Sequence, residues 1–106
     1  MTWQPEGAAV AIGFLFDIPG MTSEQYDEVC RNLNNGQPFT SLSQWPEAGI
    51  ISHVAGLTPD GWRVLDVWES EEAFQRFGQK LVPLLRQAGV QDVEPQAFPV
   101  HNVVTQ

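Results

Sequence analysis

The stretch GWRVLDVWESEEAF, at positions 61–74, decides the fold of this chain. Residues 61–69 are rich in Trp, Val and Leu and therefore predict a β-strand. Ser70 then supplies a helix N-cap, and Glu71 and Glu72 occupy the first turn, where the helix dipole favours negative charge. The stretch predicts a strand that leads directly into a helix.

A further strand is predicted before this stretch, at residues 49–56. The sequence TPDG at positions 58–61 separates the two strands and has the composition of a turn. We therefore expect an antiparallel hairpin whose loop is residues 57–60.

The helix that begins after residue 70 carries an apolar stripe as far as Ala88, and Gly89 favours its end. Pro83 lies inside this helix and is expected to kink it. A last strand is predicted at residues 97–104. Because it contains Pro99, which has no backbone N–H to donate, we expect it at a sheet edge or a bulge.

The N-terminal half predicts a loose leader at residues 1–7 and an almost wholly apolar strand at residues 8–18. Thr22 is a helix N-cap, and Gln25 completes a capping box. An apolar stripe at helical spacing then continues to about Leu33, and its members are Tyr26, Val29, Cys30 and Leu33.

The predicted order is β-α-β-β-α-β, the split pattern of a ferredoxin-like α+β domain. It has one four-stranded antiparallel sheet with both helices on one face. At 106 residues the chain has room for one domain, which we place at residues 8–106.

Composition excludes several classes of protein. The chain has 5 Lys plus Arg against 13 Asp plus Glu, for a net charge of −8, which argues against a nucleic-acid or anionic-membrane partner. No apolar stretch approaches the roughly 20 residues of a membrane span. The single cysteine, Cys30, excludes an intrachain disulfide and a cysteine-cluster metal site. We expect a cytoplasmic globular protein.

Residues 37–48 are the least regular part of the chain, with two prolines and no clear period. Phe39, Leu42 and Trp45 make this segment too apolar for a solvated linker. It is a candidate flap over another part of the molecule.

Two helices cover one face of a sheet, so the strand at 61–69 must divide its side chains between a covered and an uncovered face. We assign the odd positions to the helices. The even positions then face away from them: Trp62, Val64, Asp66 and Trp68. Two uncovered indoles are rare on a soluble monomer, so we expect a homodimer that packs sheet against sheet around a cavity. The alternative is a monomer whose segment 37–48 folds over this face.

Four pieces of sequence resemble a known superfamily. They are GMTSEQYDEV after the first strand, HVAG before the hairpin loop, GWRVLDVWESEEAF, and FPVHNV near the end. Together they resemble the dimeric α/β-barrel superfamily, and more narrowly its small stand-alone bacterial members similar to antibiotic-biosynthesis monooxygenases. The resemblance covers about residues 8–104, and its most specific piece is the junction at 68–74.

This resemblance implies a homodimer and a range of activities. The superfamily includes cofactor-independent monooxygenases, haem-degrading enzymes, lactone isomerases and polyketide cyclases. A Trp at the position of Trp68 lines the pocket in the monooxygenase branch, which implies a pocket role here. Many relatives carry a His where this chain has Phe77, so the resemblance does not extend to haem binding, and we expect no cofactor.

His53 and Asp66 are the first candidate catalytic pair. With a loop at 57–60, His53 lies opposite Val64 and diagonal to Asp66 on the same face. A carboxylate there fixes the imidazole tautomer and raises its basicity, as a general base requires. A loop one residue longer or shorter places His53 on the other face. A purely structural His–Asp hydrogen bond at a dimer seam is the alternative.

His101 is the second catalytic candidate and lies beside Asn102, a candidate ligand-binding residue. Strand alternation places His101 and Asn102 on opposite faces unless Pro99 marks a bulge. The alternative to a catalytic role is that His101 hydrogen-bonds to backbone groups at an edge strand. Two histidines and one carboxylate can form an open metal site, and the chain offers such a set in His53, His101 and Asp66. Their spacing in the sequence does not bring the three together, so we predict no metal.

The aromatic candidates for ligand binding are Trp62, Trp68 and Phe14, with Phe16 as a possible neighbour. Indoles that line a cavity stack on flat organic molecules and exclude water. The alternative for each is a place in the core or dimer seam. Cys30 lies on the apolar stripe of the first helix and is expected to be inert core.

These features predict cofactor-independent chemistry on a small aromatic or polyketide-like molecule. His53, poised by Asp66, takes a proton, and Trp62 and Trp68 hold the ring. Oxygenation or isomerisation follows. The competing hypotheses are a binding protein that sequesters an apolar ligand without catalysis and a structural dimer with a filled seam.

Overall fold

The computed structural model describes residues 11–106. The expected leader, and the start of the first expected strand, lie outside the described residues. The elements are β1 (Ile12–Pro19), α1 (Ser23–Leu33), the short 3-10 helix η1 (Leu42–Gln44), β2 (Ile50–Thr58), β3 (Gly61–Trp68), α2 (Glu71–Gln87) and β4 (Gln96–Pro99).

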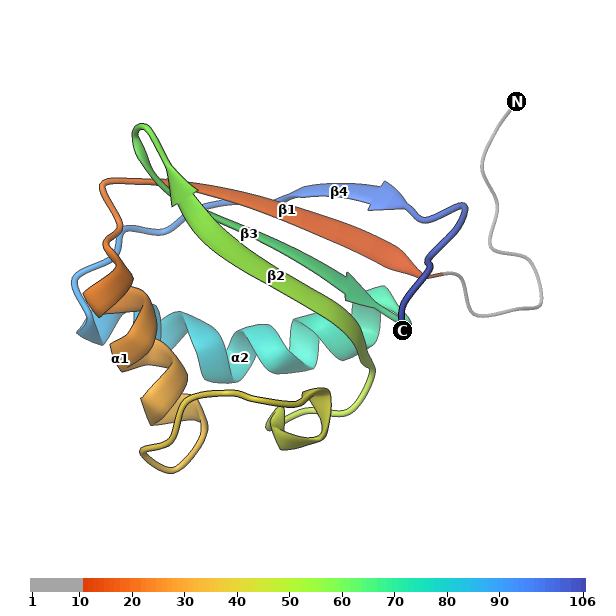
Figure 1. Ribbon diagram of the computed structural model, residues 1–106, viewed down its shortest axis with the longest axis horizontal. Coiled ribbons are helices and arrows are strands. Elements are labelled where there is room, and N and C mark those ends of the chain that lie inside the picture. The colour runs from red at the N-terminus through yellow and green to blue at the C-terminus, as the bar shows by residue number, and fades with distance from the viewer. Residues whose placement is uncertain (1–10) are drawn as a thin grey trace.

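The four strands form one antiparallel sheet in the order β2-β3-β1-β4. Both helices lie under the same face of this sheet (Figure 1). The ferredoxin-like α+β arrangement predicted from the sequence is therefore confirmed.

The predicted caps set the start of both helices. Thr22 Oγ1 accepts a hydrogen bond from the Gln25 backbone N–H at 3.1 Å, and Gln25 Oε1 accepts one from the Thr22 N–H at 3.0 Å. Ser70 Oγ accepts from the Ala73 N–H at 3.1 Å. The second helix continues across Pro83.

The hairpin differs from its prediction in the length of the loop. Thr58 pairs with Gly61, so the loop is two residues, not the predicted four. Pairing therefore extends further toward the turn, and His53 lies directly opposite Asp66 instead of Val64. Because the difference is an even number of residues, His53 stays on the same face as Asp66, as predicted.

The assignment of the two faces of β3 was wrong. The even positions, predicted to face away from the helices, face them: Trp68 packs on Phe74 and Phe77 of α2, and Trp62 packs on Tyr26 of α1. Trp68 is completely buried. The helices of this chain therefore cover both indoles, and covering them requires no second copy.

The neighbouring strand explains this orientation. On β3 both alternating sets contain apolar residues, so alternation does not choose between the faces. On β1 it does, because one set carries Phe14, Phe16 and Ile18 while the other carries Gly13 and Asp17. The pairing of β1 with β3 places the indoles on the bulky set's face, where the interior needs volume.

The face of the sheet away from the helices is also apolar. It carries Leu15, Val54, Leu65, Val67 and Phe98. Phe98 lies across Gly13, where a Cβ would clash with its ring, and is 44% exposed, while Val54 is 64% exposed. No helix in residues 11–106 covers this face (Figure 1).

The last strand lies at a sheet edge, as predicted, but it is shorter. It spans Gln96–Pro99, beside β1, and residues 101–104 are not part of it. The Val100 N–H still donates to the Ala11 carbonyl at 2.9 Å. Because the Val100 N–H points toward β1, an N–H at position 99 would point away from the sheet, so Pro99 removes no hydrogen bond at this edge.

Candidate functional site

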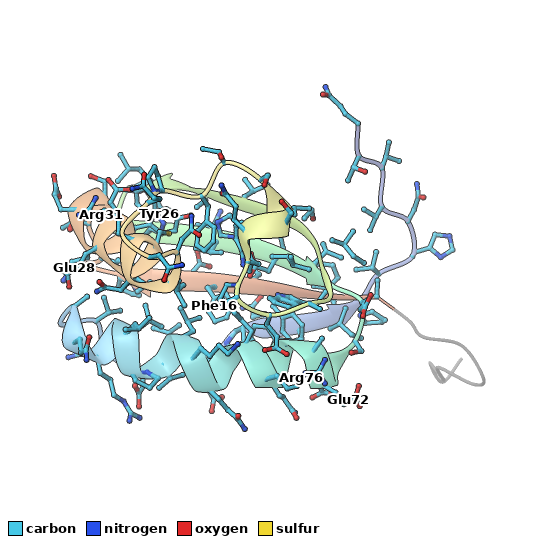
Figure 2. The ribbon with its side chains drawn as sticks, turned by 90° about the horizontal axis from the view of Figure 1, so that it is seen from below. Phe16, Tyr26, Glu28, Arg31, Glu72 and Arg76 are labelled. Atoms are coloured by element: carbon cyan, nitrogen blue, oxygen red, sulfur yellow. The ribbon has the colours of Figure 1, made fainter. Side chains whose placement is uncertain are left out.

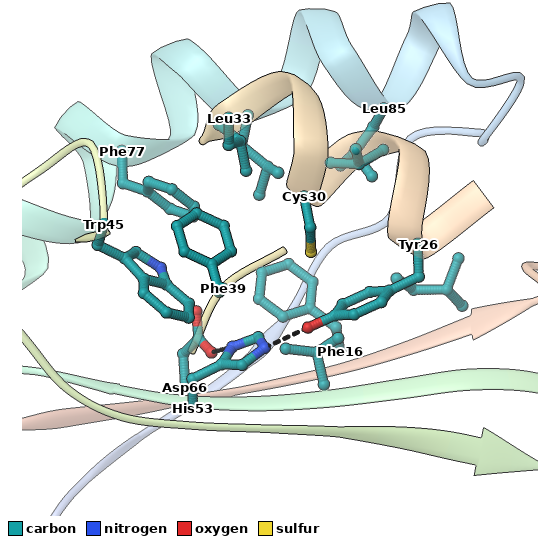
Figure 3. A pocket seen from close by; sticks show the side chains of 14 residues that line it. Phe16, Tyr26, Cys30, Leu33, Phe39, Trp45, His53, Asp66, Phe77 and Leu85 are labelled. Atoms are coloured by element: carbon teal, nitrogen blue, oxygen red, sulfur yellow. Dashed lines mark hydrogen bonds and ion pairs between the residues drawn. The ribbon is translucent and has the colours of Figure 1, made fainter. Parts of the chain in front are cut away.

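Three polar side chains from three elements form one hydrogen-bonded chain under the sheet. Asp66 on β3 and His53 on β2 face the helices from paired positions, and Asp66 Oδ1 lies 2.5 Å from His53 Nδ1. Tyr26 reaches toward them from α1, with its Oη 2.6 Å from His53 Nε2 (Figure 3). Both ring nitrogens of His53 are therefore engaged.

The carboxylate of Asp66 sets the direction of these bonds, because a carboxylate can only accept. In the neutral imidazole Nδ1 therefore carries the proton and donates to Asp66, and Nε2 is left to accept from the Tyr26 hydroxyl. Burial raises the pKa of the Tyr26 hydroxyl well above its usual range, and nearby Cys30 and the negative charge of Asp66 add to this effect. At neutral pH the hydroxyl is therefore protonated and has a hydrogen to donate.

Asp66 is held from a second side. Its Oδ2 accepts a hydrogen bond from Trp68 Nε1 at 3.3 Å, and the residue is 3% exposed. Trp68 itself is packed between the sheet and α2. The carboxylate is thus oriented by a rigid core residue, which in turn fixes the imidazole.

A cavity of about 60 Å³ adjoins this chain of groups, between the sheet and the helices. Its polar lining side chains are those of Tyr26, His53, Asp66 and Cys30, and the rest of the lining is aliphatic or aromatic (Figure 3). Burial raises the pKa of the Cys30 thiol, so the thiol stays protonated at neutral pH. The site is apolar with one polar end.

The segment 37–48 covers this cavity on the side that the helices leave open (Figure 2). The rings of Phe39 and Trp45 stack with centroids 4.0 Å apart, and the Trp45 ring lies 4.9 Å from that of His53. A groove of about 290 Å³ lies on the other side of this pair and shares Tyr26, Phe39, Trp45 and His53 with the cavity. The two stacked rings are therefore a wall between groove and cavity.

Charged contacts fasten the covering segment to α2. Glu47 accepts hydrogen bonds from Arg76 Nε at 2.9 Å and Lys80 Nζ at 3.1 Å, and Lys80 also donates to the Pro46 carbonyl at 2.5 Å. Arg76 and Lys80 are about half exposed, so solvent and salt weaken these pairs.

The segment is bounded by two glycines with positive φ. These are Gly36 at 88° and Gly49 at 109°, a region of backbone conformation that other residues rarely adopt. Hinge positions of this kind absorb large changes in backbone angle.

The structure brings together only some of the predicted site residues. His53 and Asp66 meet, directly opposed and not diagonal. Phe14, Trp62 and Trp68 are buried in the core and do not line the cavity. The cavity that the structure shows lies inside a single chain, between sheet and helices. The cavity expected between the sheets of two copies stays a prediction.

The C-terminal candidates lie elsewhere. His101 and Asn102 are exposed, follow β4 and do not line the cavity. Phe16, by contrast, does line it and lies between α2 and segment 37–48 in the view of Figure 2.

Sequence reasoning missed Tyr26 as a site residue and treated it as one member of the apolar stripe of its helix. A signal was present: a tyrosine on the core-facing side of a helix needs a hydrogen-bond partner for its hydroxyl. The sequence does not show that this partner is His53, because α1 and β2 meet only in the folded chain.

Residues 11–106 contain no group of three His, Cys, Asp or Glu side chains arranged to hold a metal ion. No helix among them combines the length and the apolar character that crossing a membrane requires.

Comparison with known proteins finds similarity in structure only. No family model matches the chain, and no curated protein matches its sequence. A crystal structure of SnoaB, a cofactor-independent oxygenase from Streptomyces nogalater, aligns with TM-score 0.57 at 14% identity and covers 92% of this chain and 100% of that one. A mutant of SnoaB aligns with TM-score 0.56 at the same identity, covering 92% and 97%.

A conserved protein from Methanosarcina mazei Go1 aligns with TM-score 0.55 at 17% identity, covering 85% of this chain and 92% of that one. Similarity at these identities establishes a shared fold. It leaves the chemistry to be argued from the site.

Proposed function

We propose that this protein binds a small aromatic or polyketide-like molecule beneath the sheet and carries out cofactor-independent oxygenation or isomerisation of it. The observation that carries the proposal is the hydrogen-bonded chain of Tyr26, His53 and Asp66, which ends in an otherwise apolar cavity. The shared fold with a cofactor-independent oxygenase supports it by analogy.

The chemistry begins with removal of a proton from a phenol or enol. His53 is the final acceptor, and the carboxylate of Asp66 stabilises the resulting imidazolium. The substrate anion is electron-rich and can be oxidised by molecular oxygen directly. In oxygenation a ring CH₂ and O₂ give a ring C=O and H₂O. In isomerisation the proton returns to a different atom.

Access to the site requires movement of the segment 37–48. The cavity of about 60 Å³ is far below the roughly 300 Å³ at which small-molecule pockets begin. Displacing the Phe39–Trp45 pair joins the cavity to the groove of about 290 Å³, which gives space for a planar ring system.

A direct test is oxidation of hydroxyanthrones and naphthols, for example 1,8-dihydroxyanthrone, in air. Oxygen uptake and quinone absorbance are followed above the rate without protein. We expect His53→Ala to lower the rate about 10²–10⁴-fold. The matched control is His101→Ala, which changes an exposed histidine away from the cavity. Failure of the whole panel to react or isomerise contradicts the proposal.

The second candidate function is sequestration of an apolar ligand without catalysis. It is favoured by the apolar lining of the closed cavity. A binding protein keeps its affinity for such a ligand in His53→Ala and shows no turnover in the wild type. Titration calorimetry beside the oxygen measurement separates the two functions.

We propose that the protein is a homodimer that associates through the uncovered face of the sheet. Val54 and Phe98 on this face are 64% and 44% exposed, and no helix in residues 11–106 covers them. Val54→Lys is expected to convert the dimer to monomers in light scattering. Leu57→Lys, an equally exposed change near the hairpin turn, should not. A wild-type particle of 11.8 kDa contradicts the proposal.

A further inference from the structure

We infer that Tyr26, and not His53, is the residue that touches the substrate, and that its hydroxyl relays the substrate proton to His53. This inference rests on the proposed function and specifies its chemistry. It assigns a catalytic role to a residue that the sequence presents as part of a helix stripe.

Neither ring nitrogen of His53 is free. Nδ1 is 2.5 Å from Asp66, and Nε2 is 2.6 Å from the Tyr26 hydroxyl. A substrate proton reaches His53 either by displacing Tyr26 or by passing through it. Displacement leaves the hydroxyl of Tyr26 without its partner in a largely apolar site, which is unfavourable.

Two aromatic rings flank His53. The Tyr26 ring lies nearly parallel to that of His53, at an interplanar angle of 11°, and Trp45 lies over His53 at 57°. Tyr26 and His53 both line the cavity and the groove of about 290 Å³, and Tyr26 also lines a groove of about 260 Å³. Tyr26 is therefore the member of the hydrogen-bonded chain that borders most of the space for a ligand (Figure 3).

The proton balance of the relay is simple. As the substrate O–H proton passes to Tyr26 Oη, the proton of Tyr26 passes to His53 Nε2. The products are a substrate anion, a neutral tyrosine, and an imidazolium paired with the Asp66 carboxylate. Since burial disfavours a tyrosinate, a concerted transfer suits this site better than a stepwise one.

The charges around the cavity define the substrate class. Its lining contains the carboxylate of Asp66 and no Lys or Arg. A substrate that arrives with a carboxylate or phosphate inside the cavity meets a buried negative charge without a compensating cation. The substrate is therefore a neutral phenol or enol, ionised only after it binds.

The test uses 4-nitrophenol, whose phenolate has its own visible absorption band, with binding measured separately by calorimetry. In the wild type we expect the ratio of phenolate to phenol to be about tenfold higher in the bound state than in water at the same pH, which is one pKa unit. Tyr26→Phe should bind the probe and lose this increase. Its ring still packs on Trp62, and near-ultraviolet circular dichroism checks the fold.

The outcomes distinguish the two proposals. If Tyr26→Phe ionises bound 4-nitrophenol as the wild type does, His53 acts directly and the relay is overturned, while the proposed function stands. If neither 4-nitrophenol nor any phenol of the oxidation panel binds the wild type, the proposed function fails and takes the relay with it.

A second measurement uses the fact that Tyr26 is the single tyrosine of the chain. Biosynthetic incorporation of 3-fluorotyrosine labels this residue alone and makes its hydroxyl more acidic. We expect the ¹⁹F resonance to shift when 4-nitrophenol binds, because the Tyr26 hydroxyl then donates to the phenolate and not to His53. An unmoved ¹⁹F resonance on binding of the probe argues against the relay.

Discussion

Replacement of Asp66 by Asn tests whether the buried carboxylate organises the site. The substitution keeps the shape of the side chain and removes one acceptor oxygen. In the folded protein Asp66 accepts from two N–H groups, those of His53 and Trp68. An amide has a single oxygen, so it accepts from one of them and turns its NH₂ group toward the other.

The size of the effect follows from burial. Trp68 is 0% exposed, and the His53 side chain is 17% exposed, so the donor that loses its partner has little water to replace it. A buried donor left without a partner costs about 1–3 kcal/mol. In a domain of this size, each kcal/mol lowers Tm by roughly 4–8 °C. If the amide turns its NH₂ toward His53, the imidazole adopts the other tautomer, whose Nε2–H donates to the Tyr26 hydroxyl, so Nε2 can no longer accept a proton from it.

The assay combines urea unfolding, followed by tryptophan fluorescence, with the rate of phenol oxidation. We expect Asp66→Asn to lose stability within that range and activity by about 10²–10⁴-fold. The matched control is Asp17→Asn, the same chemical change at a half-exposed carboxylate that pairs with Arg63 on the sheet. Asp17→Asn should leave both measurements near the wild type.

One result refutes the reasoning. If Asp66→Asn unfolds at the same urea concentration as Asp17→Asn and keeps its activity, the hydrogen bonds of Asp66 neither orient His53 nor stabilise the core. Loss of stability without loss of activity restricts Asp66 to a structural role.

Three further predictions concern the covering segment and the half-buried Tyr26. Trp45→Ala opens the wall of the cavity. The variant should lose about 1–2 kcal/mol of stability through lost apolar burial, and it should increase the fluorescence of an added apolar dye. Unchanged dye binding contradicts the role of this ring as a wall. Glu47→Gln removes the charge that holds Arg76 and Lys80, and limited proteolysis mapped by mass spectrometry should show faster cleavage within 37–48, as should the wild type in high salt. If cleavage is independent of both, these ion pairs do not hold the segment. Burial raises the pKa of Tyr26 in the folded state. The contribution of the neutral hydroxyl to stability is therefore complete below the unfolded pKa of about 10 and is lost as the pH rises above that value. Tyr26→Phe should reduce the fall in urea midpoint at alkaline pH, and an identical fall in both proteins contradicts the raised pKa.

The sequence was most informative where a structural feature depends on neighbouring residues. The capping box of Thr22 and Gln25 and the cap at Ser70 are confirmed, because each is a contact over three residues. The order of strands and helices is confirmed for the same reason. The predicted fold followed from these local features, since few topologies accommodate that order.

The sequence was less informative about which face of a strand is buried. The tryptophans of β3 were assigned to the uncovered face because the strand is apolar on both sides. Pairing with β1 decides the matter, and that pairing joins residues about fifty positions apart. The prediction that His53 and Asp66 share a face was correct even though the predicted loop was too long. The loop was in error by an even number of residues, which leaves the alternation of side chains between the two faces unchanged.

The chain by itself therefore determined the fold and the pairing of one histidine with one carboxylate, both of which depend on local pattern and on a short hairpin. Only the tertiary structure decided that the cavity lies under the sheet, that Tyr26 completes the hydrogen-bonded chain, and that the segment 37–48 closes the site. These features depend on how α1, β2 and the segment pack together, and packing of distant elements is set by shape and volume, which one-dimensional patterns do not specify.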